Sequence, residues 1–400
     1  MNARLQCIAC RKTFPLDEIR YTCDCGNLLS VERDAIGVGR DVFDARRAGR
    51  KPIDQSGVWR FREGVLDVDD VVTHPEGATR LYERAGIFFK HEGENPTGSF
   101  KDRGMTVAMT QAKRLGARAV ACASTGNTSA SLAAYAAQAG LRAIVFIPAG
   151  KVAAGKLAQT LAYGATALQV RGDFDTAMRL VREACDRLGI YLVNSINPFR
   201  IEGQKTIVWE LLQDLEWNAP DWIVVPAGNL GNTSAFGKAL REAHAAGWID
   251  RLPRLAAIQA SGANPFYLGF REDFTQRHRV AAETVASAIR IGDPVSYEKA
   301  VAAIRATNGV VEQVTDAELM AAKREIDAMG IGCEPASATT LAGVRKLRAA
   351  GLMGDGEQIV CVLTGHILKD PDSILKNVES IEIEPTIEAI IRELPDLVAT

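Results

Sequence analysis

The chain has 400 residues, of which 47% are apolar and 24% are charged, and its formal net charge is −2. This length exceeds what one small core fills, so two packed lobes with an appendage are expected. A nearly neutral chain offers no basic field for nucleic acid, and no uninterrupted apolar run of about 18 residues predicts a membrane span. The N-terminus has no apolar targeting segment, which favours a cytoplasmic protein.

Four of the eight cysteines lie within the first 25 residues. Cys7 and Cys10 form a C-x2-C pair, and after twelve intervening residues Cys23 and Cys25 form a C-x-C pair. Two thiolate pairs at this interval can hold a structural zinc ion in tetrahedral geometry. The second pair lacks the usual two-residue spacing, so reduced cysteines in a small hairpin are the alternative. We expect a zinc-ribbon-like segment over residues 1–35.

Residues 36–77 mix aspartate, arginine and glycine, and we expect them to form a lead-in arm. From Ala78 onwards, short apolar runs alternate with longer stretches of helical pattern. This alternation predicts βαβ units and a mostly parallel sheet.

Lys101 is the first candidate for chemistry. The apolar run 87–90 predicts a buried strand, and residues 94–98 break it with turn-forming residues. Ser99 can cap the helix that follows, with Asp102 completing a capping-box-like pair. Lys101 then lies in the first turn, where the helix dipole and burial lower an ammonium pKa and favour an imine-forming amine. The alternative is a solvated lysine on an exposed turn.

A second loop joins the strand 118–123 to the alanine-rich helix 130–139. It contains the hydroxyl, glycine and amide residues 124–129. Unpaired backbone N–H groups at such a turn bind anions, including carboxylates. An ordinary helix cap is the alternative.

Ser195 and Arg200 share a loop that leads from a strand into a helix. A hydroxyl and a planar guanidinium suit a phosphate group. The alternative for Arg200 is a salt bridge with Glu202 at the rim.

The segment 228–233 follows the buried strand 222–226 and precedes a helix. Gly228 and Gly231 let the backbone approach a phosphate at the helix N-terminus. The segment has neither the Gly-Lys-Ser/Thr ending of a nucleotide triphosphate site nor the dinucleotide spacing G-x-G-x-x-G. A single phosphate ester fits it better.

Thr364 follows the last clear strand, 358–363, and therefore lies at the carboxyl end, where open α/β sheets bind ligands. His366 is a candidate base, although a loop histidine more often has no catalytic task.

Taken together, these motifs resemble the pyridoxal-phosphate enzymes of fold type II, and among them the threonine synthases. The residues that carry the resemblance are Ser99-Phe100-Lys101, Ser124-Thr125-Gly126-Asn127-Thr128, Gly228-Asn229-Leu230-Gly231-Asn232 and Leu363-Thr364-Gly365-His366. The resemblance implies an α/β fold like that of the tryptophan synthase β subunit, with two open, twisted parallel-sheet lobes behind the cysteine-rich ribbon. It further implies a small lobe over residues 105–195 and a large cofactor-binding lobe over residues 78–104 and 196–400.

The resemblance also assigns roles to the candidate residues. Lys101 becomes the Schiff-base lysine for pyridoxal 5'-phosphate, Asn127 meets the cofactor's 3-oxygen and Thr364 meets its ring nitrogen. The cofactor phosphate rests on Gly228, Asn229, Leu230, Gly231 and Asn232, with Thr233 adjacent. Ser124, Thr125 and Thr128 receive the substrate carboxylate, and Ser195 and Arg200 receive the substrate phosphate.

The implied reaction converts O-phospho-L-homoserine and water to L-threonine and phosphate, and a homodimer is the family expectation. The family's E-G-N-T-P-L becomes Glu76-Gly77-Ala78-Thr79-Arg80-Leu81 here. The alternatives within the fold are a threonine or serine dehydratase and a cysteate synthase acting on phosphoserine. A different class, a non-catalytic sensor whose ribbon binds nucleic acid, is disfavoured by the net charge.

Overall fold

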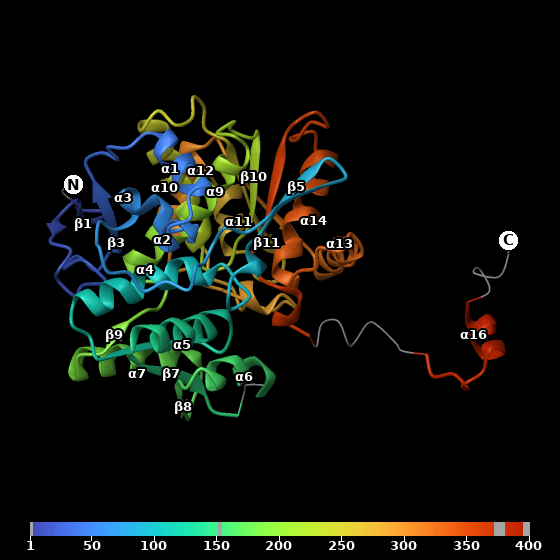
Figure 1. Ribbon diagram of the computed structural model, residues 1–400, viewed down its shortest axis with the longest axis horizontal. Helices are drawn as coiled ribbons and strands as arrows, with labels where there is room; N and C mark the ends of the chain where they lie inside the picture. Colours follow the sequence, from blue (N-terminus) through green and yellow to red (C-terminus); the bar gives the residue numbers. More distant parts are fainter. Residues whose placement is uncertain (1–2, 151–153, 372–380, 395–400) are drawn as a thin grey trace. The chain divides into compact units, whose positions relative to one another are not determined.

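The computed structural model describes residues 3–150, 154–371 and 381–394. They divide into two compact units, Met1–Lys369 and Asp370–Thr400. In the second unit, α16 (Ile387–Glu393) begins after Thr386, whose hydroxyl accepts a hydrogen bond from the Ala389 N–H. Within the described residues, the first unit contains three sheets (Figure 1).

The N-terminal ribbon is a three-stranded antiparallel sheet in the order β2-β1-β3. Its strands are β1 (Ala3–Cys7), β2 (Thr13–Phe14) and β3 (Leu29–Arg33). The expected arm, residues 36–77, contains short helices that bury Phe43, Trp59 and Phe61 completely. These elements are α1 (Arg40–Ala48), α2 (Pro52–Gln55), the 3-10 turn η1 (Trp59–Phe61) and α3 (Arg62–Val65).

The larger sheet has six strands in the order β12-β11-β10-β13-β5-β4, and all neighbours are parallel except β4 and β5. Its strands are β4 (Leu81–Arg84), β5 (Ile87–His91), β10 (Trp222–Pro226), β11 (Arg254–Ala260), β12 (Val310–Val314) and β13 (Ile359–Leu363). Both faces are covered, which explains why β10 and β13 are continuous apolar runs. Ile223 and Val225 face one core cluster, and Trp222 and Val224 face the other.

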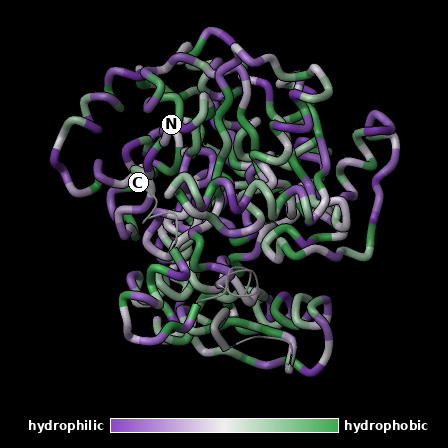
Figure 2. The backbone as a smooth tube through the Cα atoms, turned by 90° about the vertical axis from the view of Figure 1, so that its right-hand side faces the viewer, coloured by the Kyte–Doolittle hydropathy of each residue, from purple (hydrophilic) through white to green (hydrophobic). Residues whose placement is uncertain are grey.

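The smaller sheet is parallel throughout, in the order β8-β7-β6-β9. Its strands are β6 (Ala119–Ala123), β7 (Arg142–Pro148), β8 (Thr166–Val170) and β9 (Tyr191–Leu192). The helices α5 (Asn127–Ala139) and α7 (Phe174–Leu188) pack against β6 and β7 from separate core clusters. Figure 2 shows apolar segments running through the interior of both α/β parts. The expected pair of parallel sheets is confirmed, whereas the expected lobe boundaries stay a prediction.

The remaining described elements surround these sheets and the loops between them. They are η2 (Glu92–Glu94), α4 (Lys101–Arg114), α6 (Ala154–Ala162), α8 (Pro198–Gln204), α9 (Thr206–Asp214), α10 (Gly231–Ala245), α11 (Pro265–Arg271), η3 (Ser287–Ile289), α12 (Tyr297–Ala306), α13 (Asp316–Ala328), α14 (Pro335–Ala349) and η4 (Ile367–Lys369).

Helices α4 and α8 cross at two glycines. A Cβ on Gly203 would lie 1.7 Å from the Arg103 carbonyl oxygen, and one on Gly104 would lie 2.8 Å from the Arg200 carbonyl oxygen. Only glycine lets the two backbones approach so closely. The crossing brings the start of α4, with Lys101, towards the α8 turn that carries Arg200.

The ribbon contacts both α/β parts. The Tyr21 hydroxyl accepts a hydrogen bond of 2.7 Å from the N–H of Leu192 in β9. On the other side, the Lys238 ammonium donates to the Val31 carbonyl, and the Lys299 ammonium donates to the Leu29 carbonyl over 2.6 Å. The ribbon therefore connects β9 of the smaller sheet with α10 and α12, which follow strands of the larger sheet.

Candidate active site

Three neighbouring strands of the larger sheet end at the same edge and position the site. The carboxyl end of β10 leads into the glycine loop 228–233, β13 ends at Thr364, and β5 leads towards Lys101. The Phe100 N–H donates to the Thr364 carbonyl over 3.0 Å, and Ser99 forms an antiparallel bridge with Gly365. The start of α4 is thus fixed to the end of β13, as expected for a ligand site of an open parallel sheet.

Lys101 is the first residue of α4; the residue as a whole is partly exposed, whereas its ammonium group is buried. Burial of the ammonium, reinforced by the nearby Arg200 guanidinium, lowers the Lys101 pKa to about 7, whereas Glu334 opposes the shift. No carboxylate in the described part of the chain bonds this amine, whose Nζ lies 4.1 Å from the Phe100 ring centroid. About half of such an amine is neutral near pH 7, and this form can act as a nucleophile or base.

The expected capping pair of Ser99 and Asp102 is wrong. The N-cap of α4 is Phe100, and the Ser99 hydroxyl is buried without a hydrogen-bond partner. The Asp102 carboxylate accepts from the Thr97 N–H at 2.7 Å, the Thr97 hydroxyl at 2.6 Å and the Ser131 hydroxyl at 2.6 Å. Asp102 therefore holds the turn before Lys101 against α5 instead of capping its own helix.

Thr364 belongs to a hydrogen-bonded group that sequence reasoning missed. Its hydroxyl lies 3.1 Å from the Ser337 hydroxyl and donates to Glu334 Oε1 over 3.1 Å. The second oxygen of Glu334 accepts from Asn127 Nδ2 at 2.9 Å. Two predicted residues from different sheets, Asn127 and Thr364, thus meet on one buried carboxyl.

The glycine loop presents the start of α10. Leu230, not a glycine, adopts the left-handed conformation there, with φ of 62°. A Cβ on Gly228 would lie 2.9 Å from the Ile289 Cα, whereas one on Gly231 would meet only the end of the Gln204 side chain at 3.8 Å. Gly228 is therefore required by packing, and Gly231 leaves open space at the helix N-terminus.

Ser195 and Arg200 lie next to this loop. Asn229 Nδ2 donates to the Ser195 hydroxyl over 3.5 Å, so the two predicted phosphate loops adjoin. The expected alternative for Arg200, a salt bridge with Glu202, is wrong, because Glu202 pairs with Arg33 and two lysines instead.

Arg200 is 3% exposed, and its guanidinium donates only to the Val193 carbonyl, with Nε unpartnered in the described residues. Burial lowers the Arg200 pKa to about 10, which leaves it charged near neutral pH. A buried cation without a counter-ion is a favourable place for an anionic ligand.

The predicted carboxylate-binding residues Ser124, Thr125 and Thr128 lie between β6 and the first turn of α5. All three are partly exposed. Helix α5 begins at Asn127, three residues before the predicted start at Ala130, and no side chain caps it. Its first N–H groups therefore stay available to an anion, as expected for this loop.

The site fits pyridoxal phosphate. Thr233, at the start of α10, is fully buried and its hydroxyl has no hydrogen-bond partner in the described residues. This orphaned donor, the open space at Gly231 and the free N–H groups of α10 suit a phosphate ester. Lys101 would hold the cofactor's aldehyde carbon.

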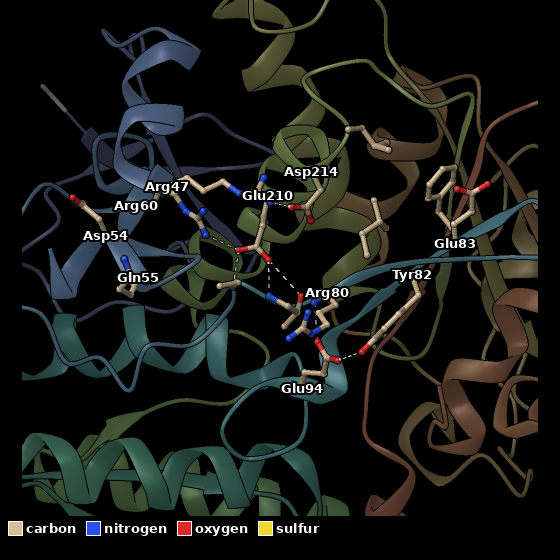
Figure 3. Close-up of a pocket in the computed structure, with 15 residues that line it drawn as sticks. Arg47, Asp54, Gln55, Arg60, Arg80, Tyr82, Glu83, Glu94, Glu210 and Asp214 are labelled. Atoms are coloured by element: carbon tan, nitrogen blue, oxygen red, sulfur yellow. Dashed lines mark hydrogen bonds and ion pairs between the residues drawn. The ribbon is translucent and has the colours of Figure 1, made fainter. Parts of the chain in front are cut away.

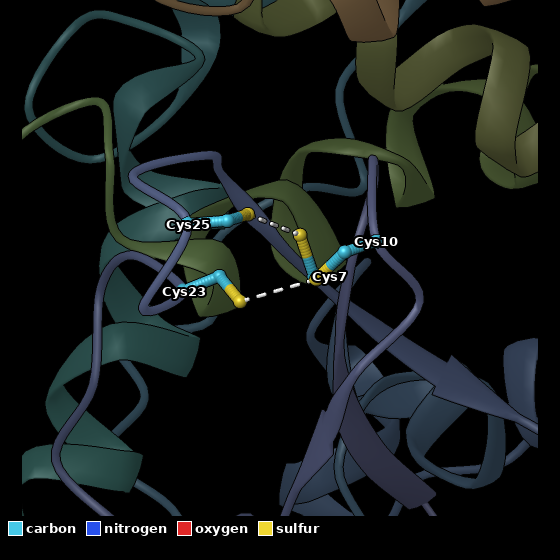
Figure 4. A group of neighbouring side chains, drawn as sticks. All are labelled: Cys7, Cys10, Cys23 and Cys25. Atoms are coloured by element: carbon cyan, nitrogen blue, oxygen red, sulfur yellow. Dashed lines mark hydrogen bonds between the residues drawn. The ribbon is translucent and has the colours of Figure 1, made fainter.

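The four N-terminal cysteines converge (Figure 4). Their sulfur atoms all lie within 4.8 Å of one another, with Cys7 and Cys25 at 3.5 Å and Cys10 and Cys23 at 3.5 Å. Four thiolates around zinc, each about 2.3 Å from the metal, would lie about 3.8 Å apart. The cluster therefore fits a structural zinc ion.

A buried ion cluster centres on Glu210, which lines the pocket drawn in Figure 3 together with Asp214 and Arg60. Glu210 pairs with Arg103 and Lys90 at 2.7 Å each and with Arg60 at 3.2 Å. It lines a cavity of about 940 Å³ whose lining includes neither Lys101 nor Arg200. No local pattern in the sequence indicates this cluster.

Comparison with known proteins agrees with this geometry. A family model described as pyridoxal-phosphate dependent enzyme matches residues 72–365. A threonine synthase from Methanocaldococcus jannaschii is 46% identical over 408 residues, covering 98% of this chain and 99% of that protein. The chain belongs to the threonine synthase family.

Other family members and solved structures are also similar. A threonine synthase from Mycobacterium leprae is 48% identical over 82% of this chain and 91% of that protein. The crystal structure of threonine synthase from Escherichia coli shares the fold with a TM-score of 0.71 at 17% identity, covering 97% of this chain and 94% of that one. The threonine synthase resemblance drawn from the motifs is therefore confirmed, with its pyridoxal-phosphate fold and cofactor.

Two smaller predictions can be assessed. His366 accepts a hydrogen bond from the Leu368 N–H through Nδ1, which ties it to its own loop and gives no support to a role as base. Within the described residues, no helix has the length and apolar character needed to span a membrane.

Proposed function

We propose that this threonine synthase family member converts O-phospho-L-homoserine and water to L-threonine and phosphate. The observation that carries the substrate choice is Arg200, a buried guanidinium that no carboxylate among the described residues neutralises. A dehydratase substrate has no phosphate to place there. Ser195 adds a hydroxyl beside it, next to the glycine loop.

Different residues bind the two charged ends of the substrate. Arg200 and Ser195 hold its phosphate, while Ser124, Thr125, Thr128 and the first N–H groups of α5 hold its carboxylate. With both ends of the substrate fixed, its α, β and γ carbons would come within reach of the Lys101 amine. The Gly228–Asn232 loop, Asn127 and Thr364 would hold pyridoxal phosphate, which would supply an electron sink for negative charge at the substrate carbons.

Lys101 moves the protons. Because burial and Arg200 lower its pKa to about 7, the amine can accept a proton from one substrate carbon and return it to another near neutral pH. Phosphate leaves from the γ carbon, and water adds at the β carbon. The Arg200 guanidinium holds the departing phosphate and stabilises its charge.

Product analysis tests the proposal. Purified holoenzyme incubated with O-phospho-L-homoserine should release L-threonine and phosphate in equal amounts. The same enzyme is incubated with O-phospho-L-serine and sulfite, and separately with L-threonine. Cysteate from the second mixture, or 2-oxobutanoate from the third, without threonine from the first, would reject the assignment in favour of a related enzyme of this fold.

The ribbon cysteines are proposed to hold one structural zinc ion. Metal analysis should find about one zinc per chain, and Cys7→Ser should lose it together with roughly 2–5 kcal/mol of stability, because the short β1–β3 sheet has little core of its own. Cys185→Ser, which removes a buried thiol outside the cluster, is the control. Wild-type protein that is stable and free of metal would contradict this role.

A cytoplasmic homodimer is the accompanying proposal on assembly and location. Light scattering of the holoenzyme should give twice the chain mass of 43.1 kDa. A monomer that retains full activity would contradict it.

A further inference from the structure

Glu334 sits behind the cofactor-binding residues and has no role in the assignments above. It is the N-cap residue of α14, where an acidic side chain usually bonds the backbone N–H groups of the first turn. Here the side chain makes no capping bond. Its two oxygens instead accept from Asn127 at 2.9 Å and Thr364 at 3.1 Å.

The backbone fixes this carboxyl in place. The Glu334 N–H donates to the Gly365 carbonyl over 3.0 Å. A Cβ on Gly365 would lie 2.4 Å from the Glu334 carboxyl carbon, so the glycine provides the space that the carboxyl occupies. Glu334 is 4% exposed, and its carboxyl bonds the two predicted site residues Asn127 and Thr364.

The hydroxyl protons of this group can be assigned by counting donors and acceptors. The Ser337 hydroxyl accepts from the N–H groups of Thr364 at 2.8 Å and Gly365 at 3.2 Å. Both of its lone pairs are then used, so its own proton points to the Thr364 hydroxyl oxygen, 3.1 Å away. Thr364 keeps one proton and one free lone pair to divide between Glu334 and the cofactor.

The charge of Glu334 decides this division. An ionised carboxylate accepts the Thr364 proton, so that the remaining lone pair of Thr364 faces the ring nitrogen and bonds it only when that nitrogen is protonated. A neutral carboxylic acid donates to Thr364, whose own proton then turns to an unprotonated ring nitrogen. Each charge state of Glu334 thus matches one protonation state of the cofactor ring.

We propose that Glu334 is a positioning residue that sets, through the Thr364 hydroxyl, whether the cofactor's ring nitrogen receives or supplies a proton in its hydrogen bond. The same carboxyl takes one of the two Asn127 N–H protons and leaves the other for the cofactor's 3-oxygen. This inference rests on the proposed function, because the contacts of Asn127 and Thr364 with the cofactor belong to it.

The surroundings of Glu334 bear on its titration. Burial raises the Glu334 pKa, whereas the bonds from Asn127 and Thr364 and the ammonium groups of Lys101 and Lys369 lower it, with burial the larger effect. The α14 N-terminus, which favours a negative charge, lies at the same residue. The buried thiol of Cys333 is a further titratable neighbour, and burial raises its pKa well above the ordinary value.

The direct test uses holoenzyme loaded with pyridoxal phosphate isotopically labelled at the ring nitrogen. In the wild type, the nitrogen chemical shift should change with pH as Glu334 titrates. In Glu334→Gln, which stays neutral, the shift should keep the value of the acidic wild-type form at every pH. Pyridoxal phosphate should also bind about tenfold more weakly, the effect of one net hydrogen bond.

Asp327→Asn is the matched control. Asp327 accepts a hydrogen bond from the Cys333 N–H, one residue before Glu334, and contacts neither Asn127 nor Thr364. The control should keep the wild-type pH dependence. A Glu334→Gln holoenzyme with wild-type pH dependence, or a control that changes as much, would overturn the proposal.

If Glu334→Gln does not fold, Thr364→Val gives the answer, because it keeps the carboxyl and removes the hydroxyl between it and the ring. The pH dependence should then disappear, and its persistence would overturn the inference. Borohydride reduction and peptide mapping distinguish a failure of the proposed function from a failure of the proposed role of Glu334. Cofactor missing from Lys101 refutes the proposed function, whereas cofactor trapped there with an unchanged nitrogen titration refutes only the role of Glu334.

Discussion

Buried cations occur in two settings in this molecule. Around Glu210, the side chains of Arg103 and Lys90 each pair with carboxylates at 2.6–2.7 Å. In the candidate active site, here called the cleft, Lys101 and Arg200 bond no carboxylate among the described residues. The paired cations keep the Glu210 pKa well below its ordinary value despite burial, whereas the cleft cations have lowered pKa values.

This difference distinguishes buried charges that stabilise the fold from buried charges that can bind a ligand. A buried pair satisfies both charges within the fold, and removing one member leaves the other uncompensated. A buried cation without a partner is costly for the empty protein and becomes favourable when an anion or an aldehyde arrives. The two sets should therefore respond in opposite ways to the same substitution.

The largest expected effect is at Lys101. Lys101→Met removes the amine and should reduce turnover by at least about 10⁴-fold, while the unfolding midpoint in urea stays at or above that of the wild type. Lys113→Met, at the exposed end of the same helix, is the control and should leave turnover unchanged. Retained activity in Lys101→Met would show that the Lys101 amine is not needed for the reaction.

Lys90→Met tests the paired cations around Glu210. Lys90 donates to Glu210 and Asp214 at 2.7 Å each, and its loss leaves buried negative charge uncompensated. The free energy of unfolding should fall by about 3–5 kcal/mol. Urea denaturation measures this loss, and the protein that remains folded should keep a normal Michaelis constant. An unaffected unfolding midpoint would show that the cluster is not needed for stability.

Arg200→Met should weaken binding of the phosphorylated substrate. We expect the Michaelis constant to rise about 100-fold, because a buried charged contact to phosphate is lost. Stability should be unchanged or higher, since a buried unpaired charge is removed. Arg241→Met, at an exposed position of α10, provides the control. Equal affinity in Arg200→Met would place the substrate phosphate elsewhere.

The smallest effect is on pH dependence. Because the folded apoprotein holds the Lys101 pKa at about 7, below its ordinary value of 10.5, the unfolded chain binds more protons between these values. This residue therefore makes the apoprotein more stable as pH rises from about 7. Covalent capture of pyridoxal phosphate, measured by borohydride reduction, should increase over the same range. The Lys101→Met protein should lack the Lys101 contribution to the stability profile.

The sequence was informative where a site residue belongs to one strand, loop and helix. Lys101, the 228–233 loop and Thr364 each follow an apolar run that ends in small or polar residues, and parallel strands bring such ends together. The positions of these elements could therefore be inferred without coordinates.

Residues whose role depends on distant partners could not be inferred this way. Glu334 meets Asn127 across 207 positions, and Glu210 meets Lys90 across 120. The Ser99 cap was predicted wrongly because local spacing could not show that Asp102 turns to Thr97 and Ser131. The left-handed Leu230 also escaped notice, because a leucine gives no sign of that conformation.

The glycine crossing of α4 and α8 determines how far apart the two helices hold Lys101 and Arg200. With main chain resting on main chain at Gly203, the separation between the backbone positions that carry Lys101 and Arg200 is fixed by close helix packing. The length of substrate that fits is then a property of the scaffold. Even one added methyl group at that contact should change which homologue of the substrate the enzyme accepts, if the chain still folds.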